Sequence, residues 1–305
     1  MPINPVLAAY SDLAYGTALV LYLLVMVLHA VEYSAGRVLA AAGGAGSVAT
    51  LARPRDALPR GKPERIGRSA VALTVLAAGI HASSLALRGA AIGRVPWANM
   101  YEFVSAICFA AMTCWLIVLY RQRATAAFLR RLGVFVLLPV VVLMFLGGTV
   151  LYANAAPLIP ALNSYWITIH VSAAITATGI LLISGVASVL YLCGSRLSSQ
   201  LPEPATLDRL AYRTAVMAFP IWTFAIIAGA IWAEAAWGRY WGWDPKETCA
   251  LVAWVVYAGY LHARATAGWR GAPAAWINVA GFAVMLFNLF FVNIVVAGWH
   301  SYAGI

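Results

Sequence analysis

Residues 232 to 247 read WAEAAWGRYWGWDPKE, a segment that places four tryptophans within twelve residues. The four are Trp232, Trp237, Trp241 and Trp243. Tryptophan rings concentrate where a membrane meets water. The sequence on both sides is made largely of Ala, Val, Leu and Ile. The segment is therefore expected to join two apolar helices at a membrane surface.

The composition of the 305-residue chain is that of a membrane protein. Hydrophobic residues make up 63% and charged residues only 10%, far outside the range of soluble domains. A helix needs roughly 20 apolar residues to cross about 30 Å of hydrocarbon. Such runs cover residues 12 to 34, 69 to 88, 100 to 120, 133 to 151, 164 to 193, 213 to 233, 247 to 266 and 274 to 298. The predicted fold class is all-α: a polytopic transmembrane helical bundle of about eight spans, forming one integral membrane domain over residues 1 to 305.

The basic residues support this count, because Lys and Arg accumulate in cytoplasmic loops. With the N-terminus outside, sixteen of the twenty fall in inside segments and four in outside segments. The four outside residues are Arg88, Arg94, Arg239 and Lys246. This asymmetry predicts that both termini lie outside. The net charge of +10 then reflects topology and attraction to the lipid bilayer, and no nucleic acid partner is expected.

The segments between the spans lack the composition of a soluble domain. Residues 35 to 68 open with Ala and Gly and continue as a run rich in Pro and Arg, which predicts a flexible cytoplasmic loop. Residues 232 to 246 are predicted to form an outer loop. No Lys or Arg precedes the first apolar run, so it is interpreted as a retained helix. All four cysteines fall within spans without a CxxC pair, which favours helix packing over disulfides; they are Cys108, Cys114, Cys193 and Cys249.

The histidines can be placed by depth, since a helix rises about 1.5 Å per residue. His170 lies six residues into its span from the outer end, and His300 follows the outer end of the last span. Two imidazoles near the Trp-rich segment suit haem, whose iron accepts one imidazole on each side. His262 falls in the inner leaflet. For His29 and His81, hydrogen bonding between helices is the favoured interpretation.

The Trp-rich segment also has a purely structural interpretation. Its rings suit any membrane interface. Asp244 is a good N-cap, Pro245 suits the first helical position and Glu247 completes a capping box. On spacing alone, an interfacial belt with a helix cap and a ligand platform are evenly matched. The outer histidine pair favours haem.

The segment from Trp232, followed by LVAWVVYAGYLHAR, resembles the "WWD" signature of haem-handling membrane proteins. It is most similar to the CcsA (ResC) family of system II cytochrome c biogenesis. Three further pieces agree in order and spacing: PWANMYE at 96 to 102, SYWITIHVS around His170 and VNIVVAGWHSYAG around His300. The resemblance covers the chain from about residue 88 to its end.

The resemblance implies a set of ligands. His170 and His300 correspond to the two outer histidines that bind haem iron, and His262 corresponds to the histidine of a second haem site within the membrane. The opposing ligand of that second site belongs to a ResB-type partner subunit. Two positions depart from the family pattern: Cys249 stands where Trp is common, and Trp299 where Leu is common.

The implied function is that of a holocytochrome c synthase of the lyase type in the bacterial cytoplasmic membrane, with its active site on the outer face. Haem b is presented to the CxxCH motif of apocytochrome c and attached covalently. His170 and His300 would be catalytic residues and iron ligands, and the other haem contacts would be Trp232, Trp237, Trp241, Trp243 and Asp244. Two alternatives remain at this stage: a haem exporter or chaperone without ligation chemistry, and a b-type haem electron carrier.

Overall fold

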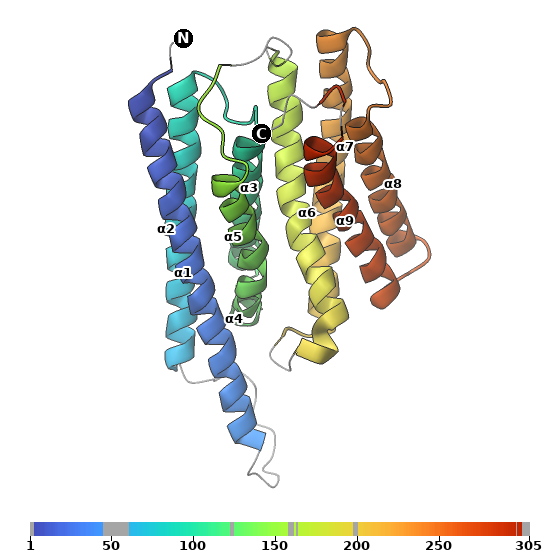
Figure 1. Ribbon diagram of the computed structural model, residues 1–305. Helices are drawn as coiled ribbons and strands as arrows, with labels where there is room; N and C mark the ends of the chain where they lie inside the picture. The colour runs from blue at the N-terminus through green and yellow to red at the C-terminus, as the bar shows by residue number, and fades with distance from the viewer. Residues whose placement is uncertain are drawn as a thin grey trace.

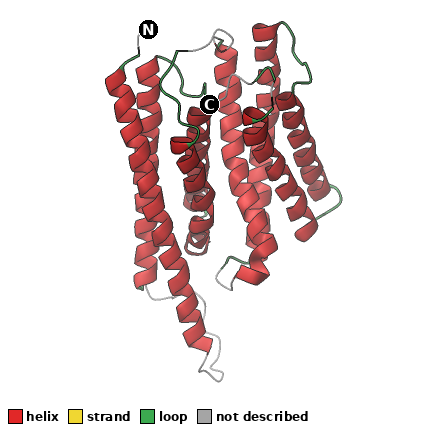
Figure 2. Ribbon diagram, viewed as in Figure 1, coloured by secondary structure: helices red, strands yellow, loops and turns green. Residues whose placement is uncertain are grey.

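A computed structural model describes residues 3–44, 61–122, 125–157, 162, 164–197, 201–296 and 298–300. The described residues form helices and connecting segments, without strands (Figures 1 and 2). The elements are α1 (Pro5–Gly44), α2 (Lys62–Ile92), α3 (Met100–Arg121), α4 (Ala126–Leu129), the 3-10 turn η2 (Arg130–Leu132), α5 (Gly133–Thr149), α6 (Tyr165–Leu197), α7 (Pro204–Trp237), α8 (Pro245–Ala265) and α9 (Ala272–Ile294). The predicted all-α helical bundle is confirmed.

Seven of the eight predicted spans are long and apolar enough to cross a membrane. The exception within the described residues is α8, which nevertheless forms a helix of 21 residues packed against α7 and α9. Its first turn contains Lys246 and Glu247 and its last turn contains His262 and Arg264. These polar ends lower the mean hydropathy of α8. Its place in the bundle therefore rests on packing against α7 and α9.

The long helices alternate in direction, so that the N-terminus and the end of the described chain lie at the same end of the bundle (Figure 1). That end also contains the α2–α3, α5–α6 and α7–α8 connections, and is called here the pocket end. The predicted placement of both termini outside stays a prediction. Which side of a membrane the pocket end faces also stays a prediction.

The observed ends of several helices differ from the loop boundaries that the sequence predicted. Helix α1 continues to Gly44 and α2 begins at Lys62, so both enter the loop expected at 35 to 68; residues 45 to 60 lie outside the described part. Helix α7 continues to Trp237, so the loop expected at 232 to 246 is reduced to residues 238 to 244. The start of α2 is polar, and Pro63 and Glu64 in its first turn suit a helix N-terminus. In contrast, α9 ends at Ile294, short of residue 298.

Helix α6 is the centre of the bundle, since it packs against α3, α7 and α9. Small residues permit this close approach. A Cβ atom on Gly179 would lie 2.7 Å from the Cβ of Ala110, and one on Gly185 would lie 2.5 Å from the ring of Phe282. The helix pairs α1–α2 and α6–α7 have extensive contacts. The backbone approach at these glycines therefore sets how closely α6 lies against α3 and α9.

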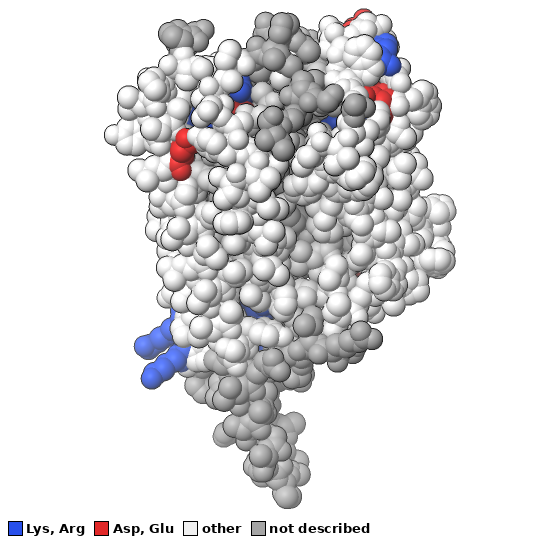
Figure 3. Space-filling model, in the orientation of Figure 1, with Lys and Arg blue, Asp and Glu red and all other residues white. Residues whose placement is uncertain are grey.

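Charged side chains are nearly absent from the middle of the face seen in Figure 3. Near the pocket end, Glu102 accepts hydrogen bonds from Arg88 at 3.0 Å and Arg94 at 2.9 Å. Near the other end, Glu32 accepts from Arg130 at 3.2 Å, and Glu32 Oε2 lies 3.4 Å from His29 Nδ1. Each buried arginine thus has a carboxylate partner, as the desolvation of a charge requires.

His81 and the cysteines behave as structural residues. The His81 ring is fully buried and its Nε2 lies 3.0 Å from Ser105 Oγ, which links α2 to α3. All four cysteines are free thiols; Cys108 and Cys114 are buried, Cys249 is half-buried and Cys193 is exposed.

Candidate haem site

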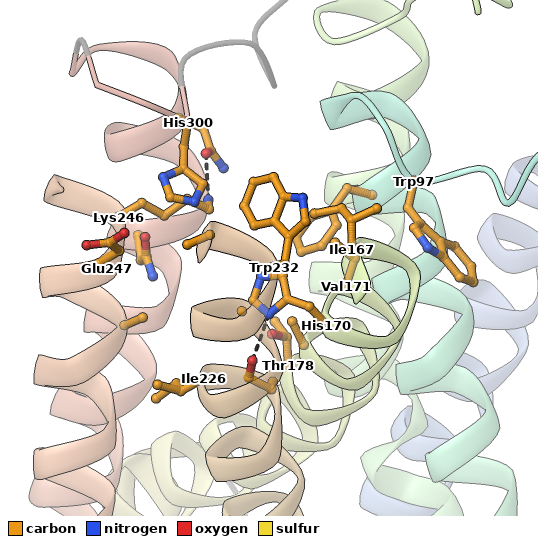
Figure 4. A pocket seen from close by; sticks show the side chains of 18 of the residues that line it. Trp97, Ile167, His170, Val171, Thr178, Ile226, Trp232, Lys246, Glu247 and His300 are labelled. Carbon is orange, nitrogen blue, oxygen red and sulfur yellow. Dashed lines mark hydrogen bonds between the residues drawn. The ribbon is translucent and has the colours of Figure 1, made fainter. Parts of the chain in front are cut away.

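The Trp-rich segment and the two outer histidines line one pocket at the pocket end of the bundle (Figure 4). His170 comes from the second turn of α6, and His300 follows α9. Trp232 comes from the last turns of α7, and Trp241 from the α7–α8 loop. Trp97, in the PWANMYE segment before α3, lines the same pocket. Tertiary structure therefore brings together residues that are distant in the chain.

His170 is held through one ring nitrogen. Its Nδ1 lies 2.7 Å from the carbonyl oxygen of Ala225 on α7. A carbonyl only accepts, so Nδ1 carries the proton and donates it, which places the lone pair on Nε2. Gly229, one turn further along α7, leaves the room for the ring, since a Cβ there would lie 2.7 Å from His170 Cε1. The imidazole is fixed in the tautomer that an iron ligand needs.

His300 is held in the same way by a carboxylate. Its Nδ1 lies 2.8 Å from Asp244 Oδ2, so Nδ1 donates and the lone pair again belongs to Nε2. The backbone N–H of Trp299 donates to Asp244 Oδ1 at 2.7 Å. A carboxylate behind a metal-ligating imidazole orients the ring and raises its basicity. Asp244 thus anchors the segment after α9 to the start of α8.

Asp244 also caps α8, as its position before Pro245 predicted. Its Oδ2 accepts from the Lys246 backbone N–H at 3.1 Å, and Glu247 Oε2 accepts from the Asp244 N–H at 3.1 Å. The predicted capping box is confirmed. Burial raises the pKa of Asp244, but the hydrogen bonds from His300 and Trp299 outweigh burial and bring the pKa below its ordinary value of 3.8. The carboxylate is therefore ionised at neutral pH.

The four tryptophans occupy different surroundings. The Trp232 ring is 1% exposed and lies between the two imidazoles (Figure 4). Its plane is within 7° of the His170 ring at a centroid distance of 6.2 Å, and its centroid lies 5.7 Å from that of His300. Trp237 contacts the His300 ring edge to face at 5.1 Å. Aromatic surface therefore surrounds both histidines.

The other two tryptophans belong to the short loop at 238 to 244. Trp241 lines the pocket and packs edge to face on Trp243 at 5.8 Å. Trp243 is 69% exposed and has φ 56°, the left-handed conformation that a bulky residue rarely adopts. Backbone strain of this kind is often found at functional sites. Trp243 does not line the pocket, so three of the four tryptophans contact the histidines or line it.

His262 lies apart from this pocket. It is exposed in the last turn of α8, at the opposite end of that helix from Asp244. Its separation from His170 and His300 agrees with the depth expected from the sequence. No residue of the described chain joins it in a metal cage of three or more His, Cys, Asp or Glu side chains.

Sequence reasoning missed several residues of the pocket. Lys246 lines it and donates to Asn293 Oδ1 at 2.5 Å. Gly229 shapes the space for His170, and Arg94 lines the pocket edge. The available signal for Lys246 was its position as one of only four basic residues in the predicted outer segments. Nothing in the local sequence signalled Gly229.

Both histidines and the tryptophan segment fall inside a match to the family described as Cytochrome C assembly protein, which covers residues 97 to 300. The chain belongs to the cytochrome c assembly protein family. Among its relatives, the cytochrome c biogenesis protein CcsA of Chlamydomonas reinhardtii is 38% identical over 220 residues, covering 69% of this chain and 61% of the relative. CcsA of Guillardia theta is 40% identical over 173 residues, covering 49% and 58%. CcsA of Synechococcus sp. (strain CC9605) is 34% identical over 264 residues, covering 72% and 82%.

These relatives confirm the resemblance to CcsA within the cytochrome c assembly family. The matched region spans about three fifths of the length of the first two relatives. Among solved structures, the fold is similar to one titled Cytochrome c Heme Lyase CcmF, with a TM-score of 0.66 and 17% identity over 95% of this chain and 47% of that chain. At that identity the likeness supports the fold alone.

Proposed function

We propose that this member of the cytochrome c assembly family is the haem-binding and haem-delivering subunit of a cytochrome c synthase. The observation that carries the proposal is the matched pair of imidazoles. His170 lies on α6 and His300 follows α9, yet both line one aromatic pocket, and each Nδ1–H donates a hydrogen bond to an acceptor of the chain itself. Haem b is the proposed substrate, because its iron accepts imidazole nitrogen and its faces suit aromatic surface.

The proposed contribution of each histidine follows from its tautomer. The Nε2 lone pair of His170 and that of His300 would bind the iron of the substrate haem, and together they would keep oxygen from it. Asp244 would strengthen ligation by His300, since an ionised carboxylate behind an imidazole raises its basicity. Trp232 and Trp237 would cover the porphyrin.

The covalent step would attach the two cysteines of an apocytochrome CxxCH motif. Each thiol adds across one haem vinyl group: one C–S bond and one C–H bond form, and the S–H bond and the C=C π bond are consumed. The addition needs no external oxidant or reductant. The chain's contribution is to hold the haem while the vinyl carbons meet the thiols, a matter of proximity and orientation. The histidine of CxxCH would replace one of the two axial imidazoles.

His262 would belong to a second, intramembrane haem site shared with a ResB-type partner subunit. Its exposure on α8 and its distance from the pocket support a ligand that faces another chain. Haem would enter near His262 from the inner leaflet and move to the outer pocket. The bacterial cytoplasmic membrane, with the pocket on its outer face, is the proposed location.

Coexpression with the ResB-type partner and a CxxCH reporter tests the proposal, with covalent haem on the reporter as the readout. We expect His170→Ala and His300→Ala to lose most of the covalent product, and His81→Ala, a buried structural histidine, to retain it in proportion to the folded protein. Normal maturation by the His170 and His300 variants would disprove the outer site. Haem binding without covalent product in the wild type would favour the haem exporter, and stable redox cycling would favour the b-type electron carrier.

A further inference from the structure

Lys246 is a half-buried basic residue that lines the pocket. Four buried or half-buried arginines each have a carboxylate oxygen within 3.2 Å; these pairs are Arg88–Glu102, Arg94–Glu102, Arg130–Glu32 and Arg264–Asp208. Among the described residues, no carboxylate oxygen lies within 4.0 Å of the Lys246 ammonium. Lys246 therefore brings a charge into the pocket without a carboxylate in direct contact, although Asp244 lies close enough to interact with it electrostatically.

The nearest carboxylates are occupied by other donors. Asp244 accepts from the side chain of His300 and the backbone of Trp299, and Glu247 Oε2 accepts from the backbone N–H groups of Gly242 and Asp244. These bonds hold the loop and the α8 cap together. The pocket's own acids are thus committed to structure, and the Lys246 charge remains for a ligand.

The ammonium is held in place by a neutral group. It donates to Asn293 Oδ1 at 2.5 Å, and Asn293 is itself oriented by donating Nδ2 to the Leu289 carbonyl at 2.7 Å. An ammonium has three donors, so two remain after the bond to Asn293. Lys246 lines the same pocket as His170 and His300, and lies beside His300 in Figure 4. The result is a positioned cation at the edge of an otherwise largely apolar cavity.

We infer that Lys246 is the positioning residue for a haem propionate. The inference rests on the proposed function and names the part of the substrate that Lys246 recognises. A carboxylate carried on an apolar macrocycle matches both the unpaired cation and the aromatic walls, and ion-paired hydrogen bonds are stronger than neutral ones. The propionates and the vinyl groups occupy opposite edges of the porphyrin. Holding a propionate at Lys246 therefore turns the vinyl edge away from Lys246, where thiols can reach it.

The test is a cycle that removes the charge from each partner in turn. The purified chain is titrated with haem and with haem dimethyl ester, in which both propionates are neutral, and binding is followed by absorbance. We expect Lys246→Gln to weaken haem binding about tenfold and to leave binding of the dimethyl ester unchanged. Lys246→Arg, which keeps the charge, should retain most of the haem affinity. Lys62→Gln, which removes an exposed lysine at the other end of the bundle, is the matched control.

Two results would overturn the inference: an equal loss of affinity for haem and for its dimethyl ester in Lys246→Gln, or no loss for either. The first is also the result expected if Lys246 holds a lipid phosphate. The His170→Ala variant separates this inference from the proposed function. If His170→Ala binds both ligands like the wild type while Lys246→Gln discriminates between them, the ligand assignment fails and the role of Lys246 stands.

Discussion

Asp244 Oδ2 accepts a hydrogen bond from His300 Nδ1 at an N···O distance of 2.8 Å, although 56 positions separate the two residues in the chain. Through this bond, the residue that caps α8 also orients one of the two pocket imidazoles. The Trp-rich segment therefore does more than supply aromatic surface, because its last residue before Pro245 sets the orientation of His300.

Replacing Asp244 by Ala is expected to weaken haem binding by about 10- to 100-fold, the usual loss when the carboxylate behind a metal-ligating histidine is removed. Spectrophotometric titration of the purified protein measures this loss. Glu234→Gln is the matched control, since Glu234 is an exposed carboxylate near the end of α7. An affinity for haem equal to that of the wild type would show that His300 does not depend on Asp244.

The charge of Asp244 also predicts a pH dependence of stability. Its pKa in the folded protein lies below 3.8, so its ionised form contributes stability that is fully present above pH 3.8 and is lost as the pH falls through the folded pKa. The difference in Tm between wild type and Asp244→Asn should therefore shrink as the pH falls below about 3.8. A difference that stays unchanged as the pH falls well below 3.8 would contradict this assignment.

Gly229→Ala should displace His170, because the new Cβ would lie 2.7 Å from both Cε1 and Nδ1 of the ring. The imidazole would have to turn, and its hydrogen bond to the Ala225 carbonyl would be lost. We expect weaker haem binding and a loss of stability of about 1 to 3 kcal/mol, measured by titration and thermal unfolding. In Gly259→Ala, the new Cβ of α8 meets nothing within 4 Å. That control should leave haem affinity unchanged.

Trp232 occupies the space between the imidazoles, and a smaller ring there should change how fast haem enters. An axial imidazole bonds directly to haem iron, whereas the Trp232 ring centroid lies 6.2 Å and 5.7 Å from those of His170 and His300. If both histidines bind one iron, the indole must move aside. Trp232→Phe should therefore speed haem association in stopped-flow mixing, while the exposed Trp243→Phe should not. Equal rates for Trp232→Phe and wild type would argue that the indole does not obstruct haem entry.

Local properties of the sequence determined much of this protein. Hydropathy predicted the helices, residue counting placed His170 and His300 near one end and His262 near the other, and the order of Asp244 and Glu247 predicted the capping box. These features depend on neighbours within a few residues or on transfer to hydrocarbon, which a single segment decides.

The site's inner geometry was decided by tertiary structure alone. The bond between Asp244 and His300, the room that Gly229 leaves for His170, and the bond from Lys246 to Asn293 all join segments that are distant in the chain. Such contacts depend on how far each helix is rotated and how closely its backbone approaches the next. No local pattern encodes that approach, because small residues and ridges on two helices set it jointly. The sequence therefore determined which residues reach the pocket end, and packing determined which of them meet.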